Sequence, residues 1–214
     1  RTQPAGIAGR SKRTSARRFA FPLFDMTLRI PSEPLFDEGL PCSIQESATE
    51  DIVCAVPQLV PVVSPDGRRI FFSSYARGPW DIWEASTHGE QEPKSFLESG
   101  STKTANDVSQ DGRYLLYREF NPGTLGDLKV VPLEGERKPR TFVGTADGET
   151  DGDCSPDGRG AAYASDGSGR KEIYAASFPE PTRRFRVTSE GGAQPRWSRD
   201  GKELFYVRSG QLFA

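Results

Sequence analysis

A Ser-x-Asp-Gly turn recurs four times at nearly even spacing, and this repeat limits the possible folds more than any other feature of the chain. The copies read SPDGRRIFFSS from Ser64, SQDGRYLLYRE from Ser109, SPDGRGAAYAS from Ser155 and SRDGKELFYVR from Ser198. Their aspartates, which are 45, 46 and 43 residues apart, are Asp66, Asp111, Asp157 and Asp200. Self-similarity with a period of about 40–50 residues is typical of β-propeller blades.

The residues of each copy suit a tight hairpin. A proline at the second position, as in Pro65 and Pro156, sets φ near −65°, and a glycine then supplies the positive φ that leads into the next strand. These glycines are Gly67, Gly112, Gly158 and Gly201. Serine and aspartate side chains cap nearby backbone amides. Because the motif occurs in every repeat, we interpret its aspartates as structural rather than catalytic.

Each repeat also has the layout of a four-stranded unit. A mixed strand precedes the turn and an aromatic-rich strand follows it, as in RIFFSSY and YLLYREF. A third strand opens with an acid at Asp81, Asp127 or Glu172, and a fourth strand closes the unit. The sequence therefore predicts an all-β fold, an incomplete propeller of about three and a half four-stranded antiparallel blades. The expected blades span residues 59–100, 101–145, 146–190 and, ending after a second strand, 191–214.

Residues 1–58 contain no copy of the turn, and we expect a basic, poorly ordered segment of unknown role there. Residues 1–18 hold six Lys or Arg and no acid, which is typical of a solvated tail or of a contact with phosphate or anionic lipid. The net charge of the whole chain is only −2, which gives no general field for nucleic acid. No run of 18 apolar residues occurs, so no membrane span is expected in this sequence.

Few residues suggest chemistry. Asp147, Glu149 and Asp151 alternate before a glycine, like the first half of a calcium loop, but the acid expected at position twelve is replaced by Gly158. An anionic rim that attracts a basic partner is the alternative interpretation. With His88 as its single histidine, the chain shows no Ser-His-Asp triad and no multi-histidine metal site. We expect neither catalysis nor a cofactor.

Two further groups are candidates for contacts. In a propeller, Asp107, Asp153 and Gln194 are expected near the central channel on the inner strands, so we predict them as binding-rim residues. We expect the contact surface to consist of the loops that enter each blade and those that join its middle strands. Arg183, Arg184 and Arg186 lie on a predicted outer strand, where charged residues commonly discourage sheet-to-sheet association.

The repeated turns and the stretch from Ser165 to Val207, SDGSGRKEIYAASFPEPTRRFRVTSEGGAQPRWSRDGKELFYV, resemble the TolB-type, WD-repeat-like β-propeller family. The long stretch is most similar to the C-terminal propeller of bacterial receptor-type serine/threonine kinases. The resemblance covers residues 59–214, and no kinase motif is present in the chain. It implies a non-catalytic binding module, the sensor part of such a kinase, in an extracytoplasmic location (periplasmic or on the outer side of the cytoplasmic membrane), with an unnamed protein or small-ligand partner.

Two alternatives remain open from the sequence. The first is a periplasmic TolB-like scaffold that binds envelope proteins. The second is the propeller gate of a prolyl-oligopeptidase-like serine peptidase, whose hydrolase domain would be separate from these residues. Fold alone does not choose between them.

Overall fold

The computed structural model describes residues 61–74, 79–88, 92–121 and 123–214, and these residues form β-strands and turns with no helix among them. The all-β prediction is therefore confirmed. The segment 1–58 that the sequence sets apart lies outside the described residues.

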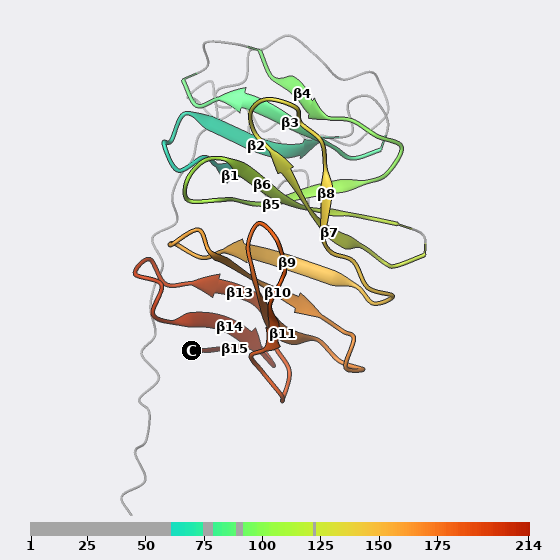
Figure 1. Ribbon diagram of the computed structural model, residues 1–214, viewed down its shortest axis with the longest axis vertical. Coiled ribbons are helices and arrows are strands. Elements are labelled where there is room, and N and C mark those ends of the chain that lie inside the picture. Colours follow the sequence, from blue (N-terminus) through green and yellow to red (C-terminus); the bar gives the residue numbers. More distant parts are fainter. Residues whose placement is uncertain (1–60, 75–78, 89–91, 122) are drawn as a thin grey trace, which may run out of the picture.

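Three four-stranded antiparallel sheets follow one another along the chain (Figure 1). Blade 1 has β1 (Val62–Val63), β2 (Arg69–Ser74), β3 (Asp81–Ser86) and β4 (Lys94–Leu97). Blade 2 has β5 (Lys103–Val108), β6 (Tyr114–Glu119), β7 (Asp127–Pro132) and β8 (Arg140–Val143). Blade 3 has β9 (Glu149–Cys154), β10 (Gly160–Ser165), β11 (Glu172–Ser177) and β12 (Arg184–Arg186). The acids predicted to open the third strands do so in all three blades.

Blade 4 has three strands, β13 (Ala193–Trp197), β14 (Leu204–Arg208) and β15 (Gln211–Phe213), so the expectation that this unit ends after its second strand was wrong. Ser209 and Gly210 both have positive φ, 50° and 74°, and they form a two-residue turn between β14 and β15. Such turns match the twist of the strands they join. The turn lets Arg208 pair with Gln211 and Tyr206 with Phe213.

Each Ser-x-Asp-Gly copy joins the first two strands of its blade through the same hydrogen bonds. In the second copy, the Ser109 hydroxyl donates to Asp111 Oδ1 at 2.6 Å and accepts from the Tyr114 amide at 3.0 Å. Asp111 Oδ1 also accepts from the amide of Arg113, and Gly112 takes φ of 69°. The other three copies repeat these contacts, so the turn is held by the side chains that define it.

The core lies between blades, because alternate residues of a middle strand face opposite neighbours. From β6, Leu115 and Tyr117 pack with Phe71 and Phe96 of blade 1, whereas Leu116 packs with Tyr163 of blade 3. Phe71 and Phe96 meet edge to face, with their ring centroids 5.0 Å apart. Both faces of the inner sheets are thus buried, and the first strand of blades 2, 3 and 4 lies against the blade before it.

Candidate functional site

The inner-strand acids tie one blade to the next. Asp107 Oδ2 on β5 accepts a hydrogen bond from the Cys154 amide of blade 3 at 2.7 Å. Asp153 Oδ2 on β9 accepts one from the Trp197 amide of blade 4, also at 2.7 Å. These two predicted rim residues therefore have their carboxylates engaged between blades, and their role in binding a partner stays a prediction.

Burial shifts the ionisation of both ties. Burial raises the pKa of Asp107 to about 6; the nearby charge of Asp153 acts in the same direction, and the Cys154 amide opposes it. Burial likewise raises the pKa of Asp153, against the hydrogen bond from Trp197 and the charge of Arg196. Each tie therefore holds a carboxylate that is costly to ionise in its place.

Gln194, the third predicted rim residue, lies in β13 at an irregularity of the strand register, with φ of 53°. Its amide approaches Asp151 Oδ2 at 3.4 Å, and its side chain is exposed. Gln194 and Asp151 thus meet across the junction of blades 3 and 4. None of the described contacts indicates what Gln194 would bind, so its role as a binding-rim residue stays a prediction.

The acidic stretch 147–153, whose alternating acids resemble half of a calcium loop, belongs to a strand from Glu149 onward. β9 begins at Glu149, which is fully buried, and Glu149 Oε1 accepts from the Thr145 hydroxyl at 2.6 Å. Asp147 also contacts Thr145, whereas Asp151 Oδ2 accepts from the Thr150 hydroxyl. Among the described residues no three His, Cys, Asp or Glu side chains gather as a metal site, and calcium binding stays a prediction.

The acids that open the third strands mark the blade junctions, which sequence reasoning did not anticipate. At the junction of blades 1 and 2, the buried Lys103 ammonium lies 2.6 Å from Asp81 Oδ1 and donates to the Ser101 carbonyl. At the next junction the position of Lys103, eight residues before the turn aspartate, holds Glu149, and the position of Asp81 holds Asp127. Burial raises the pKa of Glu149, and the Asp127 charge adds to that effect.

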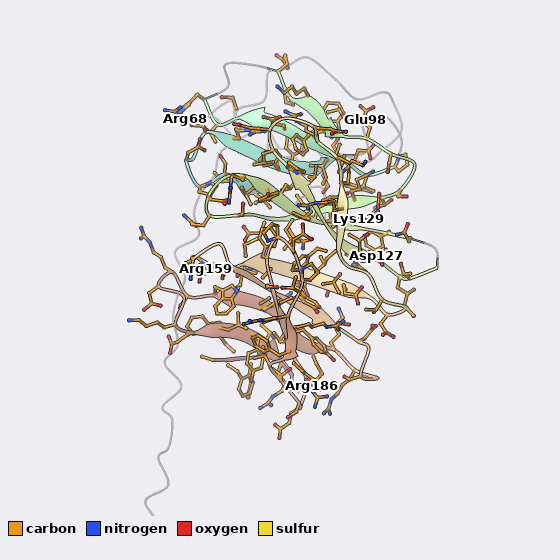
Figure 2. All side chains as sticks on the ribbon, viewed as in Figure 1. Arg68, Glu98, Asp127, Lys129, Arg159 and Arg186 are labelled. Carbon is orange, nitrogen blue, oxygen red and sulfur yellow. The ribbon has the colours of Figure 1, made fainter. Side chains whose placement is uncertain are left out.

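The loops at one end of blades 2 and 3 form a continuous surface, which we call the loop rim (residues 120–121, 123–126, 144–148 and 166–169). The Glu149 amide donates to the Gly126 carbonyl at 2.9 Å, and the Gly148 amide donates to Asp166 Oδ1 at 2.7 Å. Loops that enter a blade and loops that join middle strands thus contact each other. In Figure 2, Asp127 lies beside this rim, and Arg159, next to a Ser-x-Asp-Gly turn, lies on the opposite side of the molecule.

Leu125 is the most unusual residue of the loop rim. It is 66% exposed and has φ of 60°, a backbone conformation that a leucine adopts only at a cost. Arg118 holds it there: the Arg118 guanidinium donates to the Leu125 carbonyl at 2.9 Å and stacks over the Phe120 ring at 4.0 Å. Phe120 is itself 38% exposed. The rim thus presents two apolar side chains on a fixed support.

Acids surround these apolar side chains. Asp147 and Asp166 lie on the rim, and Asp151 follows on β9, each half-buried. Their charge is only partly balanced, because the single Arg118 guanidinium faces three acids, Asp151, Asp166 and the buried Glu149. The loop rim therefore combines exposed apolar groups with negative charge.

His88 is exposed in a turn, and its backbone amide donates a hydrogen bond to the Ser86 hydroxyl. In the described ranges no helix is long and apolar enough to cross a membrane.

No family model matches this sequence, and no curated protein matches it. Its structure is nevertheless similar to solved propellers. A protein described as TolB from Agrobacterium tumefaciens superposes with a TM-score of 0.60 at 20% identity, over 67% of this chain and 51% of that one. TolB from Acinetobacter baumannii gives a TM-score of 0.57 at 24% identity, over 71% of this chain and 38% of that one. The described residues have a β-propeller fold similar to that of TolB.

Peptidase propellers are similar as well. Prolyl oligopeptidase B from Galerina marginata gives a TM-score of 0.54 at 13% identity, over 68% of this chain and 23% of that one. At these identities the likeness shows the fold alone. The chain spans about half of the length of the Agrobacterium TolB-type propeller and less of the other two proteins.

Proposed function

We propose that this TolB-type propeller is a non-catalytic binding module that contacts a protein partner through its loop rim. The observation that carries the proposal is Leu125, which is exposed, strained and held in place by Arg118. Backbone strain persists only where the surroundings fix it, and it gathers at sites of function. Exposed apolar side chains on a fixed support are what a protein interface needs at its centre.

The charges of the loop rim define the partner's chemistry. Asp147, Asp151 and Asp166 would attract lysine or arginine side chains, while Leu125 and Phe120 would contact an apolar residue between them. We therefore infer a partner segment in which an apolar residue is flanked by basic ones. The predicted channel residues Asp107, Asp153 and Gln194 would contribute less, because two of them are occupied between blades.

The wider setting follows from the resemblance of residues 165–207. It favours the extracytoplasmic sensor of a bacterial serine/threonine kinase. The likeness to TolB supports a periplasmic scaffold as a second setting, and the likeness to prolyl oligopeptidase supports a propeller gate as a third. In all three settings the propeller itself binds rather than catalyses.

Selection from a phage-displayed library of 12-residue peptides, with the 214-residue chain as the target, tests the proposal. The informative variant is Leu125→Asn, because asparagine tolerates positive φ and removes the apolar group without unfolding the loop. Enriched peptides should contain an apolar residue flanked by Lys or Arg. They should bind Leu125→Asn at least about tenfold more weakly than the unaltered chain.

Arg159→Ala, on the opposite side of the molecule, is the matched control and should bind the same peptides normally. Enriched peptides that bind Leu125→Asn as tightly as the unaltered chain would overturn the loop rim as the contact surface. A selection that enriches acidic sequences would also contradict the inferred partner chemistry.

A further inference from the structure

The outer strand of blade 3, β12, differs from the outer strands of blades 1 and 2 at equivalent positions. In the strand registers, Glu84 pairs with Lys94, Val130 with Arg140 and Ala175 with Phe185. The first residue of each pair is the fourth of its third strand, so the second residues are equivalent. Blades 1 and 2 thus place a cation where blade 3 places phenylalanine.

At this position β12 lacks the cation that the other two outer strands carry, although Arg184 and Arg186 keep the strand positively charged. A charged side chain on an edge strand discourages another strand from pairing with it. Phe185 is 61% exposed and Val187, which follows β12, is 42% exposed, whereas Phe96 and Phe142 of the other outer strands are buried. The edge of blade 3 therefore presents an exposed phenylalanine between two exposed arginines.

The free backbone groups of β12 can be assigned from its bonds to β11. The Val187 amide donates to the Ile173 carbonyl, and the Ser177 amide donates to the Arg183 carbonyl. Because an antiparallel strand alternates its backbone groups between its two sides, the N–H and C=O groups of Arg184 and Arg186 face outward. Within the described residues β12 is the last strand of its sheet, so these groups have no neighbouring strand.

Positive charge accompanies this edge. The Arg184 guanidinium is stacked over the Tyr174 ring at 4.6 Å, which fixes its position, and Arg186 projects from the end of the blade (Figure 2). The acids of this region are already paired with arginines outside β12: Glu172 with Arg170, Glu180 with Arg140 and Glu190 with Arg208. Among the described residues, Arg183 and Arg186 form no ion pair.

We propose that the β12 edge is a second docking surface, separate from the loop rim, which binds an extended acidic peptide by strand addition. The peptide backbone would pair with Arg184 and Arg186, an apolar side chain would contact Phe185, and carboxylates would pair with the arginines. The outward N–H and C=O groups of Arg184 and Arg186 have the spacing of a β-strand, so an extended peptide can pair with them. Nucleic acid or an anionic lipid would use only the charge.

The test measures binding of a fluorescein-labelled seven-residue peptide with alternating valine and glutamate to the 214-residue chain by fluorescence anisotropy. We expect a Kd of about 10–100 μM, since a three-residue edge offers few contacts. Phe185→Lys, which copies blades 1 and 2, should weaken binding at least about tenfold, and Arg186→Thr, which copies Thr141 of blade 2, should weaken it several-fold. Leu125→Asn and Arg159→Ala should leave it unchanged.

Two altered peptides separate strand addition from simple attraction of charge. The same peptide with lysine in place of glutamate, and the glutamate peptide N-methylated at alternate amides, should both fail to bind. Equal binding of the N-methylated peptide would overturn strand addition, and tighter binding of single-stranded DNA or phosphatidylserine vesicles would overturn the peptide partner. Dimerisation in sedimentation equilibrium that Phe185→Lys abolishes would assign the edge to a second copy instead.

Discussion

At the scale of single residues, the buried and the exposed aspartates of this propeller respond to pH in opposite directions. Burial raises the pKa of Asp107 to about 6 from 3.8. In the exposed turns, hydrogen bonds from the serine hydroxyls lower the pKa of Asp66, Asp157 and Asp200. Asp107 therefore stabilises the folded state when it is protonated, whereas the turn aspartates stabilise it when they are ionised.

The sign of the pH dependence follows from these shifts. Between about pH 4 and pH 6 the folded chain retains a proton on Asp107 that the unfolded chain has lost, so the free energy of unfolding falls as pH rises through this window. The stability that the turn aspartates contribute is present above about pH 4 and is lost below it. Stability should therefore be greatest between about pH 4 and pH 5.

We predict that the free energy of unfolding of the unaltered chain is about 1–3 kcal/mol lower at pH 7 than at pH 4.5. Urea denaturation at the two pH values measures this difference. Asp107→Asn should reduce it, because the titrating group is gone, while Asp200→Asn in an exposed turn should not. A chain that is equally stable at both pH values would contradict the assignment to Asp107.

At the scale of elements, each blade junction solves the same problem with different side chains. An acid opens the third strand of blades 1, 2 and 3, at Asp81, Asp127 and Glu172. Lys103 neutralises the first, whereas the third accepts hydrogen bonds from Arg170, Thr188 and the Gly191 amide. Asp127 instead faces Glu149 and retains a buried oxygen, Oδ1, with no hydrogen bond. Among the described junctions, the one between blades 2 and 3 thus brings together two acids that form no ion pair, and Asp127 is held by the Asn121 amide instead.

Reciprocal substitutions test this difference. Glu149→Lys recreates the Lys103 arrangement beside Asp127 and should raise the free energy of unfolding by about 1 kcal/mol, with Glu149→Gln giving a smaller gain. Lys103→Glu places two buried carboxylates together and should cost about 3–5 kcal/mol. Urea midpoints of the three variants at pH 7 provide the comparison. Loss of stability in Glu149→Lys would show that Asp127 is balanced in another way.

Elements were predictable from the sequence where the signal is local. The Ser-x-Asp-Gly turns and the acid at the start of each third strand place the strands of three blades, because hairpin chemistry lies within a few consecutive residues. The turn at Ser209 and Gly210 was also visible in the sequence as a serine-glycine pair, but its significance was missed. The ties from Asp107 and Asp153, and the burial of Glu149, depend on residues of other strands and had no local signal.

At the scale of the whole molecule, the blades differ in burial along the chain. The middle strands of blades 2 and 3 contain fully buried side chains, such as Leu115, Leu116 and Tyr163. Every residue of β14 in blade 4 is only half-buried. Local opening costs least where few apolar contacts hold a strand. Blade 4 should therefore open more readily than its neighbours.

Hydrogen exchange followed by mass spectrometry measures this gradient. We expect the amides of β6 and β10 to exchange last, and those of β14 and β15 to exchange at least about tenfold faster. Addition of about 2 M urea should widen the difference before global unfolding. Uniform protection of all four blades would show that blade 4 is held as firmly as the rest.

The ties between blades also bear on how such a chain can change in length. The carboxylate of each tie lies four residues before its own turn aspartate, and the amide it holds lies three residues before the next turn aspartate. One repeat of about 45 residues thus carries both halves of the connection. A duplicated repeat inserted beside blade 3 would bring a matching acceptor and a matching donor with it. Gene duplication can therefore add a blade to this architecture with the backbone tie at the new seam already in place.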